Sequence, residues 1–409
     1  MNEPVVLSPS NFRRELKGAP RIAKMAASLA VKIRYGQLDI TFPDGRNFRI
    51  LGTEPGPAGV LKIHDWRFFK MVVKSGDVGV GEAFMAGYWS SPDVTTFLEV
   101  FCLNQESTME ALQGQPLTRL LLSVRHWLNR NTKKGSKRNI SAHYDLGNAF
   151  YQEWLDPSMT YSSAVYSNET NDLEQAQRQK YELLARQTGI EPGHSVLEIG
   201  CGWGGFAEYV AKNVGANVRA LTISREQFEY AQERIFKAGL NEKVDVVFQD
   251  YRDEKGIYDR IASIEMFEAV GEKYWATYFR QVAQCLKPGG KAGLQIITIQ
   301  DTMFDDYRRG TDFIQRYIFP GGMLPPPGKL AELGKSIGLD LAEQTIFGQD
   351  YARTLSEWRQ RFRQAWPNIR PLGFDERFKR LWEFYLHYCE AGFRAGNIDV
   401  RQMVYVKPA

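Results

Sequence analysis

The stretch that most constrains how this chain can fold runs from Val196 to Gly205. It reads Val-Leu-Glu-Ile-Gly-Cys-Gly-Trp-Gly-Gly, and a helical pattern follows over 206–214. The short apolar run is typical of a buried strand. Glycines let the backbone approach a ligand closely, and free N–H groups at the start of a helix point towards it. The stretch therefore predicts a strand, a tight ligand-binding turn and a helix.

The glycine spacing alone fits more than one cofactor. Gly200, Gly202 and Gly205 also match a dinucleotide fingerprint, but the next predicted strand ends in 222–224, Thr-Ile-Ser, without the carboxylate expected there for a ribose. Glu198 lies on the strand before the first glycine, and the turn at 286–290, Leu-Lys-Pro-Gly-Gly, precedes another apolar strand. This arrangement resembles the class I methyltransferases, and the resemblance implies S-adenosylmethionine as the cofactor.

Predicted strands and helices alternate along the second half of the chain. The strands are expected near 194–199, 217–223, 244–249, 258–264 and 291–298. Such alternation predicts an α/β fold with a doubly wound, mostly parallel sheet, which the class I resemblance extends to seven strands. Ligands of these sheets bind beyond the carboxyl ends of the strands.

The 409 residues predict two domains and a linker. A small N-terminal α+β domain is expected over 1–124 and a catalytic domain over 140–409. Within the catalytic domain, about 300–328 is expected to cover the substrate, and 351–395 is a helical segment rich in aromatic residues. The linker, 125–139, contains six basic residues and no acidic residue within 125–138, beside Trp127. It is either a solvated linker or a contact for anionic lipid head groups.

The composition narrows the partners and the compartment. The net charge of +4 is too small to indicate a nucleic-acid partner. The four cysteines are scattered without metal-ligand spacing, which predicts a reduced compartment and no metal site. No signal peptide and no apolar run of membrane-spanning length is visible, so a cytoplasmic protein is expected.

Several motifs resemble the cyclopropane fatty acid synthase family, including its relatives that modify mycolic acids. The resemblance extends from the N-terminal domain to the end of the chain and is strongest from His143 onward. The segments that carry it are 143–148 (His-Tyr-Asp-Leu-Gly-Asn), 160–162 (Thr-Tyr-Ser), 200–205, 222–227 (Thr-Ile-Ser-Arg-Glu-Gln), 250–253 (Asp-Tyr-Arg-Asp), 266–268 (Met-Phe-Glu), 317–322 (Tyr-Ile-Phe-Pro-Gly-Gly) and 391–394 (Ala-Gly-Phe-Arg).

The resemblance implies methyl transfer from S-adenosylmethionine to the cis double bond of an unsaturated phospholipid acyl chain. The product would carry a cyclopropane, methylene or methyl-branched chain. The enzyme would work peripherally on the inner membrane leaflet, with a lipid-binding N-terminal domain and a possible homodimer. The residues expected to contact the cofactor are Tyr161, Ser162, Glu198, Gly200, Cys201, Gly202, Thr222, Ile223, Gln227, Tyr251 and Arg252.

The sequence departs from the family at the base of the reaction. The ring-forming members hold a bicarbonate ion as base, through a cysteine, a glutamate, a histidine and a tyrosine. This chain keeps the glutamate as Glu268 and the tyrosine as Tyr385, but it has Ser163 at the cysteine position and Gln295 at the histidine position. Glu265 stands where those members have a glycine. These five residues are the expected catalytic set. Glu265 is expected to replace bicarbonate as a built-in base, unless it pairs with a nearby cation and only shapes the pocket wall.

Two other functions fit parts of this pattern. One is N-methylation of a small amine, because plant N-methyltransferases share much of the catalytic domain. The other is lipid binding without catalysis, which predicts a broken cofactor loop, whereas 200–205 is intact.

Overall fold

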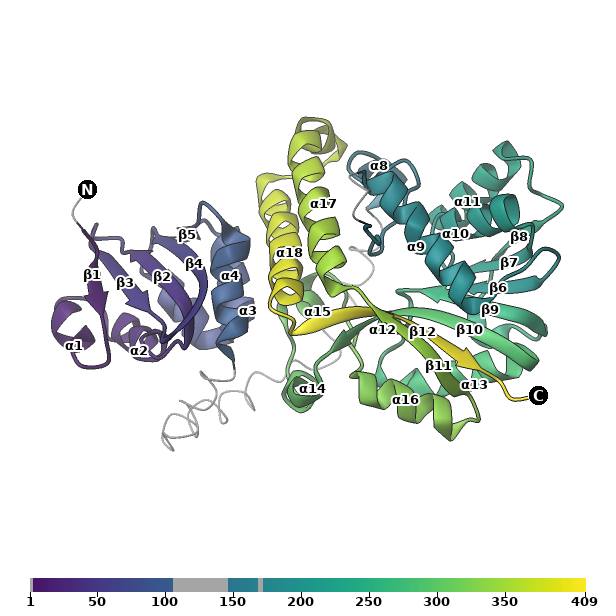
Figure 1. The fold of residues 1–409 in the computed structure, drawn as a ribbon. Coiled ribbons are helices and arrows are strands. Elements are labelled where there is room, and N and C mark those ends of the chain that lie inside the picture. The colour runs from purple at the N-terminus through teal and green to yellow at the C-terminus, as the bar shows by residue number, and fades with distance from the viewer. Residues whose placement is uncertain (1–2, 106–145, 168–171) are drawn as a thin grey trace. The chain divides into compact units, whose positions relative to one another are not determined.

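The computed structural model describes residues 3–105, 146–167 and 172–409 (Figure 1). The linker expected at 125–139, the expected domain start at 140 and residues 143–145 lie outside the described residues. The chain divides into two compact units. The first comprises Met1–Ser141, Asp312–Ile318 and Gly373–Asn397, and the second comprises Ala142–Thr311, Phe319–Leu372 and Ile398–Ala409.

The first unit contains a five-stranded mixed sheet in the order β1-β3-β2-β4-β5. Strands β2 and β3 form an antiparallel hairpin around the predicted turn at 43–45, where Gly45 has φ 84°. The elements of this unit are β1 (Val5–Leu7), α1 (Phe12–Glu15), α2 (Arg21–Ala30), β2 (Tyr35–Thr41), β3 (Asn47–Leu51), β4 (Glu54–Ile63), α3 (Arg67–Met85), β5 (Trp89–Ser90), α4 (Val94–Leu103), α15 (Phe313–Tyr317) and α18 (Glu376–Arg394).

Glycines shape α3, and two helices from late in the sequence, α15 and α18, pack against it. Gly76, with φ 57° and ψ −130°, breaks the helix at the predicted glycine-rich corner. A Cβ atom on Gly81 would lie 2.4 Å from the ring of Phe313, so only glycine lets α15 pack there. The hydroxyl group of Tyr317 on α15 donates to Glu82 at 2.5 Å, and that of Tyr388 on α18 donates to Asp77 at 2.9 Å.

The second unit contains a seven-stranded sheet in the order β11-β12-β10-β9-β6-β7-β8. All neighbouring strands are parallel except β12, which is antiparallel to both β10 and β11. The strands are β6 (Ser195–Ile199), β7 (Asn217–Thr222), β8 (Val244–Phe248), β9 (Tyr258–Ile264), β10 (Leu286–Ile299), β11 (Asp340–Ile346) and β12 (Ile398–Val406). The predicted fold class and the five predicted strands are confirmed.

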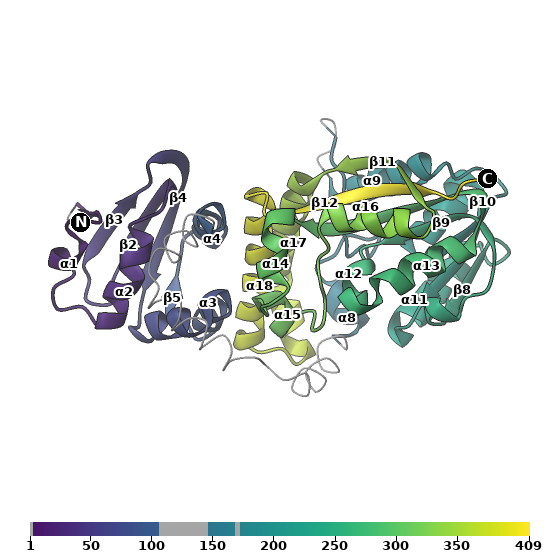
Figure 2. The same ribbon diagram turned by 90° about the horizontal axis from the view of Figure 1, so that it is seen from below.

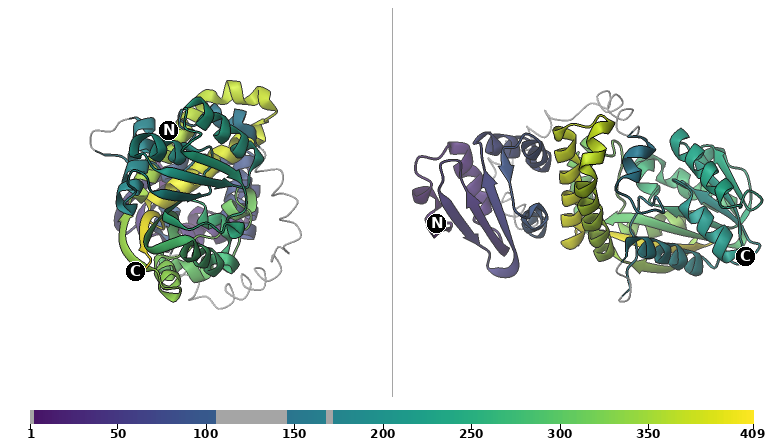
Figure 3. Two further views of the ribbon diagram at one scale, coloured as in Figure 1. Left: turned by 90° about the vertical axis from the view of Figure 1, so that its right-hand side faces the viewer. Right: turned by 90° about the horizontal axis from the view of Figure 1, so that it is seen from above.

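Helices cover both faces of this sheet (Figures 2 and 3). Alternate residues of β6 face opposite sides, because side chains along a strand alternate. Leu197 and Ile199 pack with α13, whereas Val196 packs with α9 and α10. The helices of this unit are α8 (Gly147–Gln152), α9 (Leu173–Thr188), α10 (Gly205–Tyr209), α11 (Arg225–Lys237), α12 (Phe267–Val270), α13 (Trp275–Cys285), α14 (Asp301–Tyr307), α16 (Pro327–Ser336) and α17 (Gly348–Ile369), with single π or 3₁₀ turns at Val210–Val214, Tyr251–Asp253, Glu272–Tyr274 and Arg370–Leu372.

Two expected segments of the catalytic domain are divided between the units. The segment near 300–328 contributes α14 to the second unit and α15 to the first. The aromatic segment 351–395 forms α17 in the second unit and α18 in the first. Among the described residues, no helix combines the length and apolarity required to cross a membrane.

Candidate active site

The turn after β6 is a glycine loop whose backbone excludes side chains. Gly200, Gly202 and Gly204 have φ angles of 80°, 54° and 81°, which other residues adopt only with strain. A Cβ atom on Gly200 would lie 2.7 Å from Met266, whereas one on Gly202 would meet no described atom within 4 Å. The buried thiol of Cys201 faces its own loop, with Sγ 3.7 Å from the carbonyl oxygen of Gly202. The backbone at Gly202 is therefore open to a ligand, and its contact with the cofactor stays a prediction.

The end of β7 places a hydroxyl group and an amide beside this loop. Thr222 donates from Oγ1 to Oε1 of Gln227 at 3.0 Å and accepts from the N–H of Ser224 at 3.2 Å. Ser224 caps α11. Ile223 between them is 71% exposed, so its side chain is available to cover a ligand. The residues at this strand end, 222–224, include no carboxylate.

The turn after β8 carries Tyr251 and Arg252. The guanidinium of Arg252 binds the carboxylate of Asp250 at 2.6 and 2.9 Å, which lowers the pKa of Asp250. The N–H of Gln249 donates to the carbonyl oxygen of Thr222 at 3.0 Å, which ties this turn to the end of β7.

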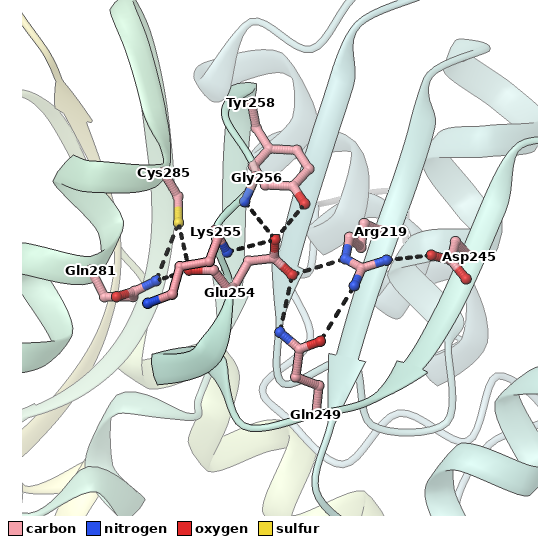
Figure 4. Close-up of polar contacts among 9 residues, drawn as sticks. All are labelled: Arg219, Asp245, Gln249, Glu254, Lys255, Gly256, Tyr258, Gln281 and Cys285. Atoms are coloured by element: carbon pink, nitrogen blue, oxygen red, sulfur yellow. Dashed lines mark hydrogen bonds and ion pairs between the residues drawn. The ribbon is translucent and has the colours of Figure 1, made fainter.

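The buried carboxylate of Glu254 stabilises the turn that follows it, at 255–258, through the hydrogen bonds drawn in Figure 4. Glu254 accepts from the N–H groups of Lys255 and Gly256, from the hydroxyl group of Tyr258 and from Arg219. Arg219 also pairs with Asp245 at 2.5 Å. This network bonds within itself and is therefore a structural support for the turn.

Three buried charged residues lie beside the glycine loop. Lys180 is fully buried on α9, and its Nζ donates to Oγ of Ser162 at 2.6 Å. Gln177, one turn earlier, donates to the carbonyl oxygen of Ser162 at 2.9 Å. Burial lowers the pKa of Lys180 to about 7 and raises that of Glu198 to about 8. Oε2 of Glu198 and Oδ1 of Asp156 have no hydrogen-bond partner among the described residues. Buried polar atoms without a partner leave hydrogen bonds to be made, which a bound ligand or water can supply.

Aromatic rings line the approach to the loop. The ring of Tyr161 lies 5.2 Å from that of Trp358 and 5.3 Å from that of Tyr151, centroid to centroid. The ring of Trp203, in the loop itself, lies 5.0 Å from Tyr151, and its Nε1 donates to Oδ1 of Asn148 at 2.7 Å. Such faces attract cations, including a sulfonium.

The carboxylate of Glu265 accepts three hydrogen bonds at the end of β9. Its Oε1 accepts from the N–H of Ser163 and from Nε2 of Gln295, both at 2.8 Å, and its Oε2 accepts from the hydroxyl group of Tyr351 at 2.7 Å. Its backbone has φ 49°, a strained value for a residue other than glycine. Burial raises its pKa, and the three donors oppose that shift by stabilising the anion.

Glu268 lies three residues further on, in the first turn of α12. Its Oε1 accepts from the N–H of Ile297, and its Oε2 is buried without a hydrogen-bond partner among the described residues. Burial, followed by repulsion from Glu265, raises the pKa of Glu268 to about 8. The pair therefore combines a buried carboxyl group whose three donors favour its anion with a neighbour that has no such set of donors and tends to stay protonated.

The structure brings four of the five expected catalytic residues into one group: Ser163, Glu265, Glu268 and Gln295. Their catalytic roles stay predictions. The hydrogen bonds to Glu265 come from an N–H, an amide and a hydroxyl group, and the buried Lys180 adds an electrostatic attraction that opposes the rise in the pKa of Glu265. The alternative that Glu265 pairs with a cation stays a prediction. Tyr385, the fifth residue, lies on α18 in the first unit, and its role also stays a prediction.

Sequence reasoning missed two residues of this group. Tyr351 reaches Glu265 from α17, 86 positions away, and no local pattern marks it. Lys180 did carry a signal. It lies in helical register with the buried Leu173, Ala176 and Leu184, where a charged residue is unusual.

The sheet order, the glycine loop and the polar strand ends define an S-adenosylmethionine-dependent methyltransferase of class I. The chain belongs to the mycolic acid cyclopropane synthetase family, whose sequence model matches residues 131–403.

Curated relatives cover most of the chain. Tuberculostearic acid methyltransferase UfaA1 of Mycobacterium tuberculosis is 37% identical over 357 residues, covering 83% of this chain and 81% of that protein. The cyclopropane-fatty-acyl-phospholipid synthase of Escherichia coli K12 is 35% identical over 376 residues, covering 90% of this chain and 95% of that protein.

Solved structures match the catalytic part. The cyclopropane synthase MmaA2 of Mycobacterium tuberculosis matches with a TM-score of 0.62 at 31% identity, over 66% of this chain and 98% of that chain. The mycolic acid cyclopropane synthase CmaA1, in complex with SAH and CTAB, has the same TM-score at 29% identity, with the same coverage.

Proposed function

We propose that this methyltransferase adds the methyl group of S-adenosylmethionine to the double bond of an unsaturated acyl chain carried on a phospholipid. The relatives that cover most of the chain support this substrate class by their names, a tuberculostearic acid methyltransferase and a fatty-acyl-phospholipid synthase. The described residues also fit the cofactor, since the space above Gly202 is open and an unpaired carboxylate oxygen of Glu198 lies buried beside the loop.

The chemistry determines what the surrounding residues must do. When bound, S-adenosylmethionine supplies an electrophilic methyl group. The π electrons of the alkene form the new carbon–carbon bond, which leaves a positive charge on the neighbouring carbon of the lipid. Water would quench that charge, so the site must be dry. The aromatic rings around Tyr161 exclude water, and their faces stabilise a nearby cation by about 0.5–2 kcal/mol each.

A base must then take a proton from the lipid. Loss from the added methyl group closes a three-membered ring. If a hydride first shifts from the methylated carbon to its cationic neighbour, the charge moves to the methylated carbon, and loss of a proton from the methyl group then forms a methylene group. Our proposal is that the carboxylate of Glu265 takes this proton in place of bicarbonate. The single observation that carries it is the arrangement of three donors, from Ser163, Gln295 and Tyr351, on one carboxylate at the end of β9.

This base favours a methylene or methyl-branched product over a ring. The N–H of Ser163 and the amide of Gln295 both donate to the Glu265 carboxylate. The ring-forming members of the family use the residues at these two positions to hold an exogenous ion instead. Conversion of a methylene product to a methyl branch needs a separate reductant, which a partner enzyme would have to supply.

The lipid substrate requires contact with a membrane surface. The basic segment 125–138 stays a prediction, because it lies outside the described residues. A second basic segment, 12–34, lies in the first unit and carries seven basic residues and one acidic residue. Its excess of +6 is larger than the +4 of the whole chain.

Helix α2, in the middle of segment 12–34, has the character of an interfacial helix. Arg21, Lys24 and Met25 share one face by helical spacing, and the side chain of Met25 is 43% exposed. The opposite face packs Ala23 and Ala27 into the unit. A basic face flanked by apolar side chains suits an anionic bilayer. We therefore infer peripheral binding through this face. A homodimer stays a prediction.

The proposal is tested by incubating the purified protein with methyl-labelled cofactor and either unsaturated phospholipid vesicles or small soluble amines. We expect label in the lipid only, in a product heavier by one CH₂ unit, and fragmentation then distinguishes a ring from a methylene group. Label in the amines and none in the lipid would contradict the substrate class.

A further inference from the structure

Gln402 is a buried amide that no part of the proposed reaction yet uses. It lies on β12 directly opposite Gln295 on β10, and the two side chains are 0% and 1% exposed. Both side chains are therefore out of reach of solvent, and their hydrogen bonds must be made within the protein.

A directed chain of hydrogen bonds runs from Gln402 to Glu265. Nε2 of Gln402 donates to the carbonyl oxygen of Lys180 at 3.2 Å and to Oε1 of Gln295 at 3.0 Å. Nε2 of Gln295 in turn donates to Oε1 of Glu265 at 2.8 Å and to the carbonyl oxygen of Ser163 at 3.4 Å.

The direction of this chain is fixed at its far end. The carbonyl oxygen of Lys180 can only accept, so the amide of Gln402 must turn its NH₂ group towards it. The same NH₂ group also faces Gln295, so the amide oxygen of Gln295 must accept its hydrogen bond. The NH₂ group of Gln295 is thereby left pointing at Glu265. Reversing either amide would place oxygen against oxygen or NH₂ against NH₂ at several contacts.

We propose that Gln402 is a positioning residue, which fixes the amide of Gln295 so that its NH₂ group always faces the carboxylate of Glu265. This inference rests on the proposed role of Glu265 as the base. A free glutamine amide could turn and present its oxygen to the carboxylate, which would repel it. The chain from Lys180 removes that freedom, so the NH₂ group of Gln295 favours the ionised form of the carboxyl group, which can receive a proton.

A second observation separates this role from simple packing. Oε1 of Gln402 is buried and has no hydrogen-bond partner among the described residues. An unsatisfied buried acceptor destabilises the folded state, and methionine would fill the same space without that cost. Retaining an amide here gains the two directed bonds from its NH₂ group.

The test compares Gln402→Met and Gln402→Glu with the wild-type enzyme in turnover against pH. Methionine removes the donor, so Glu265 loses its fixed partner and its pKa rises. The acidic limb of the turnover profile should move up by about one pH unit, with cofactor affinity unchanged. Glutamate reverses the chain, because it accepts from Gln295 and turns the amide oxygen towards Glu265. Its limb should move further than that of the methionine variant.

A matched control removes another buried amide from the same unit. Gln281, 8% exposed, donates from Nε2 to the carbonyl oxygen of Glu254 at 2.7 Å and is no part of the chain to Glu265. Gln281→Met should lower the melting temperature by a similar amount while leaving the acidic limb in place. If the methionine variant of Gln402 does not fold, the glutamate variant, which keeps length and polarity, decides the question.

Failure of this inference is distinguishable from failure of the proposed base. If Glu265→Gln is inactive while both variants of Gln402 keep the wild-type acidic limb, the positioning role is contradicted and the base assignment stands. If Glu265→Gln keeps full activity, the base assignment and the positioning role both fall.

Discussion

The hydroxyl group of Tyr351 donates a hydrogen bond of 2.7 Å to the carboxylate of Glu265, although the two residues are 86 positions apart. Tyr351 lies on α17 and Glu265 at the end of β9, so the bond joins a covering helix to the sheet. Together with Ser163 and Gln295, Tyr351 surrounds the carboxylate with donors.

Replacing Tyr351 with phenylalanine should therefore destabilise the ionised form of Glu265, while the ring still fills the same space. A hydrogen bond to a charged group contributes about 1.5–3 kcal/mol, so we expect turnover to fall about tenfold or more at neutral pH and less at high pH. The measurement is the pH profile of turnover. Tyr405→Phe is the control, because it removes a buried tyrosine hydroxyl group that bonds the carbonyl oxygen of Leu330 instead. Equal losses in both variants would indicate a general effect on packing.

The glycine loop yields a prediction about the cofactor. Gly202→Val should abolish binding of S-adenosylmethionine, because its side chain would project into the open space above the loop and because φ 54° disfavours a branched residue. Calorimetric titration measures this directly, and circular dichroism checks that the variant remains folded. Native cofactor affinity in a folded variant would show that the loop has been misassigned.

The raised pKa of Glu268 makes the free energy of unfolding depend on pH. Its pKa rises from an ordinary 4.5 to about 8, so between these values the native state holds a proton that the unfolded chain has released. The native state then binds more protons, and the free energy of unfolding falls as pH rises through this window.

Glu268→Gln removes that dependence. We expect the variant to gain stability relative to wild type between pH 5 and pH 8, on the order of 4 kcal/mol, because one pKa unit corresponds to about 1.4 kcal/mol. Chemical denaturation at the two pH values measures the difference. A constant difference at both values would mean that Glu268 is ionised in the native protein.

The membrane face is tested by charge removal in the first unit. Replacing Arg13, Lys17, Arg21 and Lys24 with glutamine should weaken binding to anionic vesicles by up to about a thousandfold, since each basic residue near the surface contributes about 1 kcal/mol. The salt dependence of binding should also flatten. The control carries the same loss of charge on exposed lysines of the second unit: Lys212, Lys237, Lys243 and Lys335.

Equal weakening in the two sets would point to net charge alone. Sedimentation with vesicles measures the binding of both sets. The same assay tests the basic segment 125–138 through glutamine at Lys133, Lys134, Lys137 and Arg138, which should also lower vesicle affinity. If replacement of the basic residues in 12–34 or in 125–138 leaves vesicle binding at low salt unchanged, that segment does not contact the membrane.

The sheet and the cofactor loop could be predicted because their signals are local. An apolar run followed by glycines specifies the turn at 200–205, and alternation of strands and helices specifies the layered fold. The polar ends of β7, β8 and β9 follow from the rule that ligands bind beyond the carboxyl ends of parallel strands.

The partners of Glu265 could not be predicted in the same way. Tyr351 and Gln402 reach the site through tertiary packing, from a helix and an antiparallel strand late in the chain. Nothing in the sequence around either residue points to Glu265. The aromatic segment 351–395 likewise reads as one stripe, whereas α17 and α18 belong to different units.

The role of Glu265 as a built-in base is tested most directly by the dependence of turnover on bicarbonate. Wild-type enzyme and Glu265→Gly are assayed with unsaturated phospholipid in buffer stripped of carbon dioxide, and bicarbonate is then added. We predict full wild-type turnover without bicarbonate, and a nearly inactive glycine variant that bicarbonate partly restores, more so when combined with Ser163→Cys and Gln295→His. Wild-type turnover that requires bicarbonate would contradict the role of Glu265.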